Sequence, residues 1–192
     1  WHPLRNEWVT ITSHRNARPW SSGDAPLNQD TTQQSFDADC YLCPGNTRVS
    51  GKQNDAYEGL FVFDNDHPSF SDAAPRNLEV PPGIYRNAPA TGITRVMCYS
   101  PNHTESLAEL DQARFEAVLD CWADETQSLM QRSDVAQVLV FENKGEVIGV
   151  SNPHPHCQLY AAGFEFKNLE LERLAMESHH HETGRHLMSD VI

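Results

Sequence analysis

The stretch VAQVLVFENKGEVIGVSNPHPHCQLYAA, residues 135–162, says more about the fold than any other part of the sequence. Its two ends, 135–143 and 157–162, predict strands, because each is a short run dominated by apolar residues. Between them lie His154 and His156, separated by one proline. An extended chain directs residues i and i+2 to the same side, and the proline restricts the backbone. The two imidazoles are therefore expected to be held rigidly.

Working outward, the longest predicted helix covers 110–132, where apolar residues recur at spacings of three and four. Asp111 is its expected N-cap. Three further strands are predicted, at 7–12, 57–66 and 94–100. From Asn168 onward the tail is charged and loosely helical. Elements in this order predict an α+β domain, in which the helices pack on a mostly antiparallel sheet.

The bulk properties restrict the class of protein. The 192 residues fit one domain, and a composition of 39% hydrophobic and 21% charged residues is that of a soluble globular protein. No run approaches the roughly 18 apolar residues of a membrane span, and no secretory signal is visible at the start. The net charge of −13 argues against an extended nucleic-acid surface, although two or three arginines in one cleft can hold a nucleotide. We expect a cytoplasmic protein that binds neither membranes nor nucleic acid.

The five cysteines form an odd set, and without a secretion signal a disulfide framework is not expected. Cys40 and Cys43 form a CxxC followed by the turn residues Pro44 and Gly45, a common thiolate knuckle for zinc. A CxxC is also compatible with a redox pair or with coincidence. A zinc knuckle would need two further ligands from distant parts of the chain.

Neutral hydrogen-bonding side chains and glycines surround the paired histidines. Asn143, Ser151 and Gln158 flank them, and Gly145 and Gly149 let backbone N–H groups approach an anion closely. Phosphoryl transfer needs this equipment, because its catalysis is mostly positioning and charge stabilisation. Imidazole is a competent nucleophile, since much of it is unprotonated at neutral pH. By itself, a histidine pair beside prolines is more often structural than catalytic.

In its context, FENKGEVIGVSNPHPHCQ at 141–158 is similar to the active-site signature of the galactose-1-phosphate uridylyltransferase family. Four upstream motifs resemble that family in the same order: HRNARPW at 14–20, CYLCPGN at 40–46, FDND at 63–66 and SPNHTESLAEL at 100–110. The resemblance covers about Trp8 to Glu172, and such a series of motifs is very specific. It implies that 1–192 is a histidine-triad-like domain, the N-terminal half of a polypeptide about twice as long.

The resemblance implies a two-step transfer of UMP. His156 would attack the α-phosphorus of UDP-glucose, form a uridylyl-histidine and release glucose-1-phosphate, and galactose-1-phosphate would then take the uridylyl group. Gln158 cannot donate a proton to a leaving group, which favours transfer over hydrolysis. Asn65 and Asp66 would contact the uridine, although alone they are typical of a turn after a strand. The other expected substrate-binding residues are Arg15, Arg18, Asn143, Gly149, Val150 and Ser151.

The resemblance also implies two metals and a homodimer. His103 and His154 would complete the zinc site with the knuckle cysteines, giving a closed Cys₂His₂ shell and a structural zinc. That zinc would tie the loop of the nucleophile to two distant segments. Glu172 falls where the family has a carboxylate ligand of a second, iron-type metal, whose other ligands lie in the C-terminal half. Residues that recognise the sugar phosphate would come largely from that half and from the partner subunit.

Three alternatives remain. A related nucleotidyltransferase or phosphorylase would act on another nucleotide sugar such as ADP-glucose, but such relatives tend to have serine where this chain has prolines around the histidines. A histidine-triad hydrolase would need a third histidine at position 158. A zinc-stabilised nucleotide-binding module would keep the fold without turnover. Val150 departs from the cysteine of many family members, a change that a site built from backbone amides tolerates.

Overall fold

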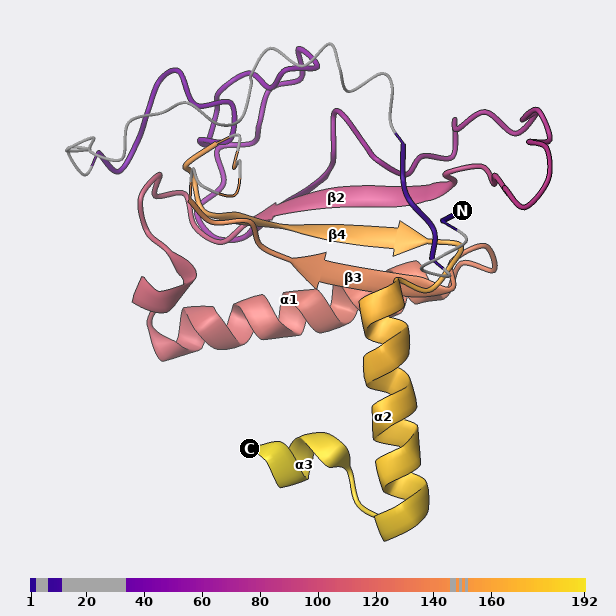
Figure 1. Cartoon of the computed structure of the whole chain (residues 1–192). Helices are drawn as coiled ribbons and strands as arrows, with labels where there is room; N and C mark the ends of the chain where they lie inside the picture. The colour runs from indigo at the N-terminus through magenta and orange to yellow at the C-terminus, as the bar shows by residue number, and fades with distance from the viewer. Residues whose placement is uncertain (3–6, 12–33, 146–147, 149, 151) are drawn as a thin grey trace.

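The computed structural model describes residues 1–2, 7–11, 34–145, 148, 150 and 152–192, and its centre is a four-stranded antiparallel sheet (Figure 1). The strands are β1 (Phe61–Asp64), β2 (Gly92–Cys98), β3 (Gln137–Phe141) and β4 (His156–Ala162). Their order across the sheet is β1-β2-β4-β3. The central strands β2 and β4 pair along their full length, and Cys98 lies opposite His156. The second histidine of the pair is therefore the first residue of a central strand.

Helix α1 (Gln112–Met130) covers one face of this sheet (Figure 1). Asp111 caps it, because its carboxylate accepts a hydrogen bond from the Arg114 backbone N–H at 2.9 Å. Val118 and Leu129 are buried against the central strands and form the main core with them. Each such side chain contributes about 1.5–3 kcal/mol when it leaves water. The helix therefore closes one face of the sheet and leaves the other for the site.

Alternate residues of β4 face opposite sides of the sheet. Leu159 and Ala161 pack in the main core beside α1. His156, Gln158 and Tyr160 therefore project from the other face. A second, smaller buried cluster joins Val96 and Cys98 of β2 to three residues of the CxxC loop, Cys40, Leu42 and Cys43. The CxxC loop thus packs on the face of the sheet that carries His156.

The remaining helices lie outside the sheet. A short 3-10 helix, η2 (Leu107–Glu109), precedes α1. Helix α2 (Lys167–Thr183) follows β4 and projects away from the sheet (Figure 1), and α3 (Leu187–Val191) ends the chain. Gly184 ends α2 with a φ of 71°, a left-handed conformation that favours glycine. Among the helices described here, none is long and apolar enough to cross a membrane.

The α+β class, the antiparallel sheet and the long helix are as predicted from the sequence. The strand predicted at 7–12 is wrong over the described residues 7–11, where Glu7 alone forms an isolated bridge, with His2. Val9 and Ile11 are 54% and 83% exposed, so this segment has no sheet to pack on. Residue 12 lies outside the described part. The other strands are present with different bounds, and the loosely helical tail forms the regular helix α2.

Candidate metal centre and active site

The CxxC loop is built by backbone turns and two asparagines. The Cys43 backbone N–H donates to the Cys40 carbonyl at 3.2 Å, which closes the knuckle. Asn46 Nδ2 donates to the Cys40 carbonyl at 2.8 Å, and Asn54 Nδ2 donates to the Cys43 carbonyl at 3.0 Å. Gly45 follows with a φ of 74°, a conformation that most residues avoid. These contacts fix the two sulfurs before any metal binds.

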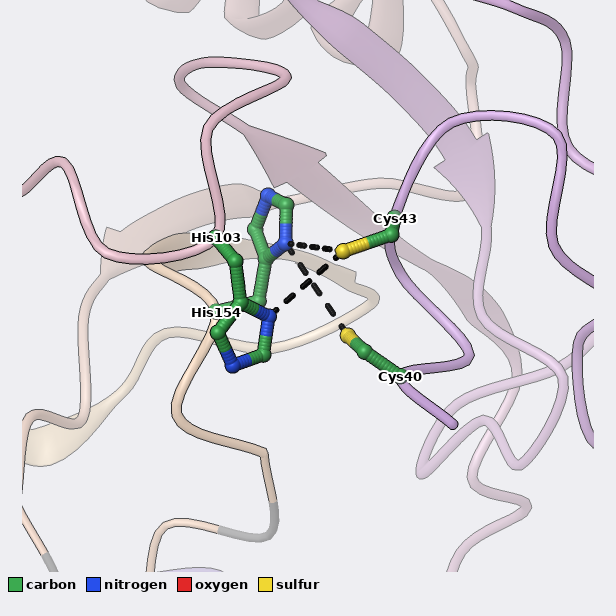
Figure 2. Close-up of side chains that lie close together, drawn as sticks. All are labelled: Cys40, Cys43, His103 and His154. Carbon is green, nitrogen blue, oxygen red and sulfur yellow. Dashed lines mark hydrogen bonds between the residues drawn. The ribbon is translucent and has the colours of Figure 1, made fainter. Parts of the chain in front are cut away.

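Four side chains from three distant segments converge at this knuckle. Cys40, Cys43, His103 and His154 are all buried, and their ligand atoms lie within 4.8 Å of one another. Cys43 Sγ is 3.5 Å from Nδ1 of each histidine. Figure 2 shows both rings turned toward the sulfurs. Among the described residues this is the one group of three or more potential ligands that gathers in this way.

The geometry fits a tetrahedral zinc ion. Zn–S bonds of about 2.3 Å and Zn–N bonds of about 2.0 Å place sulfur and nitrogen ligands about 3.5 Å apart. The two Cys43 distances match this value, and Cys40 Sγ is 3.9 Å from His154 Nδ1. Burial raises the pKa of the Cys43 thiol to about 11, so a thiolate there requires a nearby cation. The four residues can hold a metal ion, and their chemistry suits zinc.

Contacts around the two histidine ligands determine which ring nitrogen of each carries the proton. His154 Nε2 lies 3.0 Å from the Ser100 carbonyl, so it carries the proton and leaves Nδ1 toward the thiols. Burial lowers the pKa of His154 to about 4, which keeps the ring neutral. On the other histidine, His103 Nε2 lies 3.9 Å from the Asp37 carboxylate. Cys40 Sγ accepts a hydrogen bond from Asn152 Nδ2 at 3.4 Å.

A backbone carbonyl also sets the tautomer of His156, but here the protonated nitrogen is Nδ1 rather than Nε2. Its Nδ1 lies 2.7 Å from the backbone carbonyl of His154, so Nδ1 donates and Nε2 keeps its lone pair. His154 is fully buried in the ligand group, whereas His156 is partly exposed at the start of β4. Burial lowers the pKa of His156 as well, which favours the neutral ring. The partly exposed imidazole of His156 is therefore the one of the two that another molecule can reach.

Gln158 stands two residues further along the same face. Its side-chain Oε1 accepts a hydrogen bond from the Tyr160 hydroxyl at 3.2 Å, and that hydroxyl is 3.1 Å from Ser69 Oγ. Because Oε1 is already engaged, the amide presents Nε2 as a donor. This face of β4 thus carries an imidazole with an unprotonated Nε2 and, two residues along, an amide N–H donor.

Only some of the residues predicted to bind substrate lie in the part of the chain that the structure describes. Asn65 Oδ1 accepts a hydrogen bond from the His67 backbone N–H at 2.8 Å, which is the turn that its sequence also indicated. The Asp66 carboxylate lies 3.3 Å from the Ser50 backbone nitrogen and 3.8 Å from Arg48 Nε. Asn143 is exposed, and the Val150 N–H donates to the Gly145 carbonyl at 3.4 Å. Arg15, Arg18, Gly149 and Ser151 lie outside the described residues.

Glu172, predicted as a ligand of a second metal, is exposed on α2. Three residues that were not predicted from the sequence contact site residues directly: Ser100 contacts His154, Asn152 contacts Cys40 and Tyr160 contacts Gln158. Asn152 could have been predicted, because an asparagine side chain often accepts a hydrogen bond from the backbone N–H two residues further on. Here Asn152 Oδ1 accepts from the His154 N–H at 2.9 Å. The others act through contacts that only the fold creates.

The fold of this chain resembles that of solved uridylyltransferases. A solved uridylyltransferase matches with a TM-score of 0.69 and 22% identity, over 97% of this chain and 52% of that chain. An ADP-glucose phosphorylase from Arabidopsis thaliana, solved with bound ADP-glucose, matches with a TM-score of 0.59 and 21% identity, over 96% and 55% of the two chains. At these identities the likeness shows the fold alone, and that fold agrees with the predicted α+β class.

Sequence comparison identifies the family. The family model of the galactose-1-phosphate uridyl transferase N-terminal domain matches residues 1–165. The galactose-1-phosphate uridylyltransferase of Rattus norvegicus is 36% identical over 188 residues, which is 98% of this chain and 49% of the relative. The chain therefore belongs to the galactose-1-phosphate uridyl transferase family. It spans about half the length of the curated relatives that it matches.

Proposed function

We propose that the protein transfers UMP from UDP-glucose to galactose-1-phosphate through a covalent uridylyl-histidine on His156. The products are UDP-galactose and glucose-1-phosphate. One observation carries the proposal: the Nδ1–H of His156 donates to the His154 carbonyl, which leaves the lone pair on Nε2 of this partly exposed side chain. Family membership supports the proposed reaction type and substrates.

In the first step, the Nε2 lone pair of His156 forms a bond to the α-phosphorus. The bond from that phosphorus to the bridging oxygen breaks, and its electron pair leaves with glucose-1-phosphate. The Nδ1–H bond to the His154 carbonyl helps to bear the positive charge that forms on the ring. Gln158 Nε2 donates to a phosphoryl oxygen. In the second step, a phosphate oxygen of galactose-1-phosphate attacks the same phosphorus, and His156 leaves with its electron pair restored.

A zinc ion held by Cys40, Cys43, His103 and His154 would be structural, because four protein ligands close its coordination shell. When bound, it supplies a rigid crosslink between three segments. His154 would bind the zinc through Nδ1, and its backbone carbonyl accepts the hydrogen bond from His156 Nδ1. The metal centre thereby holds the proposed nucleophile in place.

For substrate binding, we propose that Asn65 and Asp66 contact the uridine and that Arg15, Arg18, Asn143, Gly149, Val150, Gln158 and Ser151 contact the phosphates. The ion pair of Arg48 with Asp66 supports a fixed carboxylate that can accept from a ribose hydroxyl. Asp66→Ala should reduce the preference for the ribo over the 2′-deoxyribo form of UDP-glucose at least about tenfold, because the site loses the group that bonds the hydroxyl. Competition binding measures this. Asp64→Ala, at an exposed carboxylate at the end of β1 and two residues before Asp66, is the control. Equal binding of both forms by the unmutated protein contradicts the assignment.

Further proposals follow from the family alone. Glu172 would bind a second, iron-type metal, and the family resemblance places its other ligands in the C-terminal half. Among the described residues no second group of three potential ligands gathers. The protein would act as a cytoplasmic homodimer in which the other half and the partner subunit complete the sugar-phosphate site. These statements remain predictions.

A stoichiometric release assay tests the proposed function. Full-length protein mixed with UDP-glucose alone should release one glucose-1-phosphate per active site and then stop, because the uridylyl group stays on the enzyme. Adding galactose-1-phosphate should restart turnover. Continuous release without acceptor indicates hydrolysis, and release from ADP-glucose but not from UDP-glucose indicates a phosphorylase or another nucleotidyltransferase. No release from either indicates a binding module.

A further inference from the structure

An ion pair between Arg114 of α1 and Glu105, in the segment before the helix, connects to the proposed metal ligand His154 through two further contacts. Arg114 donates to both carboxylate oxygens of Glu105, at 2.8 and 2.6 Å. Glu105 Oε2 accepts a hydrogen bond from the Ser100 hydroxyl at 2.5 Å. The backbone carbonyl of Ser100 lies 3.0 Å from His154 Nε2. We call the series Arg114, Glu105 and Ser100 the Ser100 clamp.

We propose that the Ser100 clamp positions the metal centre: Arg114 and Glu105 hold the Ser100 carbonyl where it fixes the ring and tautomer of His154. A histidine that donates one N–H to a fixed acceptor keeps its lone pair on the other nitrogen, which here faces the thiols. The inference rests on the proposed zinc site. It assigns to Glu105 and Arg114 a role as positioning residues, not as ligands.

The same clamp also constrains the second histidine ligand. Within the turn, the Ser100 hydroxyl accepts a hydrogen bond from the Asn102 backbone N–H at 3.0 Å. Asn102 Oδ1 in turn accepts from the Thr104 backbone N–H at 3.1 Å. His103 lies between these contacts, and the turn ends at Glu105. Two of the four metal ligands therefore depend on one ion pair.

The exposure of the clamp shows that its main role is orientation. Ser100 is 2% exposed, whereas the side chains of Glu105 and Arg114 are 21% and 39% exposed. An ion pair exposed to that degree adds little to stability. Bidentate geometry, however, fixes the direction of the carboxylate, and the carboxylate fixes the Ser100 hydroxyl. The backbone of His154 extends the effect, because its carbonyl accepts from His156 Nδ1.

The test uses full-length zinc-loaded protein and the variants Glu105→Gln and Arg114→Ala. Zinc transfer to a chromogenic chelator should be about tenfold faster in each, the usual effect of losing a contact behind a metal ligand. The double variant should be no faster than the faster single variant, because both residues act through Ser100. Arg114→Lys, which keeps the charge without the bidentate geometry, should be intermediate. In the cobalt(II)-substituted protein, the absorption bands of the metal should shift in the variants, since the His154 ring turns.

Arg132→Ala is the matched control, because Arg132 also donates to a carboxylate through two nitrogens, at the far end of α1. It removes the ion pairs of Arg132 with Asp72 and Asp134, and none of these residues is a metal ligand. Zinc release and the cobalt spectrum should therefore stay unchanged. Unchanged release in folded Glu105→Gln and Arg114→Ala overturns the clamp and leaves the zinc site standing. So does equal acceleration in Arg132→Ala. An unmutated protein that binds no stoichiometric zinc overturns the zinc site and the clamp together.

Discussion

At the scale of single residues, the proposed chemistry depends on which atom of each side chain is left free. His156 commits Nδ1 to the His154 carbonyl, and Gln158 commits Oε1 to Tyr160. What remains is a lone pair on one residue and an N–H donor on the other. An attack on phosphorus requires the first, and the charge that develops on a phosphoryl oxygen requires the second.

The Tyr160 hydroxyl is predicted to matter because it sets the direction of the Gln158 amide. In Tyr160→Phe, the amide loses the donor that holds Oε1 and can turn over. Removing a donor to a developing charge costs about 10²–10³ in rate, so losing only its orientation should lower kcat on the order of tenfold. KM for UDP-glucose should change little, because the nucleotide contacts remain.

Steady-state kinetics check this, with Tyr99→Phe as the matched control. The Tyr99 hydroxyl donates to Glu142 at 3.1 Å, and its ring packs in the core beside α1 rather than next to Gln158. An unchanged kcat in Tyr160→Phe, or an equal loss in both variants, argues against the orienting role.

At the scale of elements, the metal centre joins three segments that the sheet alone does not hold together. The CxxC loop, the turn at Ser100–Glu105 and the segment before β4 meet at the four ligands. Loss of a structural metal is among the few changes that cost about 4 kcal/mol or more. In a domain of this size, that corresponds to a fall in Tm of roughly 8–16 °C.

Cys40→Ala is therefore predicted to lower zinc content and Tm together, because binding free energy at a closed site is also folding free energy. Elemental analysis and thermal unfolding measure the two quantities. Cys121→Ala, at a half-buried thiol of α1 outside the ligand group, should keep its zinc. Full zinc content in Cys40→Ala, or no metal in the unmutated protein, contradicts the assignment.

The pairing of the central strands depends on Gly92, the first residue of β2. Its φ is 144°, and a Cβ there would lie 2.1 Å from the Ala161 carbonyl oxygen. Gly92→Ala should therefore force the two strands apart at this end and cost about 1–3 kcal/mol. Denaturant unfolding measures the loss. Gly59→Ala, where nothing lies within 4 Å, should be close to neutral, and equal stability of the two variants contradicts this account.

At the scale of the whole molecule, local sequence patterns predicted the fold class and the two cysteine ligands. The spacing of three and four in α1 and the apolar runs of β3 and β4 are local signals, and they predicted those elements. CxxC indicated Cys40 and Cys43 as a possible zinc knuckle, and HPH indicated His154 and His156 as candidates for chemistry. Only the family resemblance joined His103 and His154 to the cysteines, because 60 and 111 residues separate them from Cys43.

The rest depends on tertiary contacts that no local pattern encodes. Ser100 reaches His154 across 54 residues of chain through a backbone carbonyl, which has no residue-type signature. The segment of Val9 and Ile11 alternates like a strand, yet it has no partner strand over the described residues. Alternation predicts a strand only where a sheet exists to receive it.

The central claim is that His156 becomes covalently uridylylated, and mapping the adduct tests it most directly. Full-length protein is incubated with UDP-glucose labelled in the uracil ring, digested under mildly alkaline conditions that preserve a phosphoramidate, and sequenced by mass spectrometry. We predict one UMP adduct, on the peptide that contains His156. It should be absent from His156→Gly, which should keep its zinc and fold, whereas His154→Asn should mainly lose metal. A label on any other residue, or transfer activity retained in His156→Gly, would contradict the account.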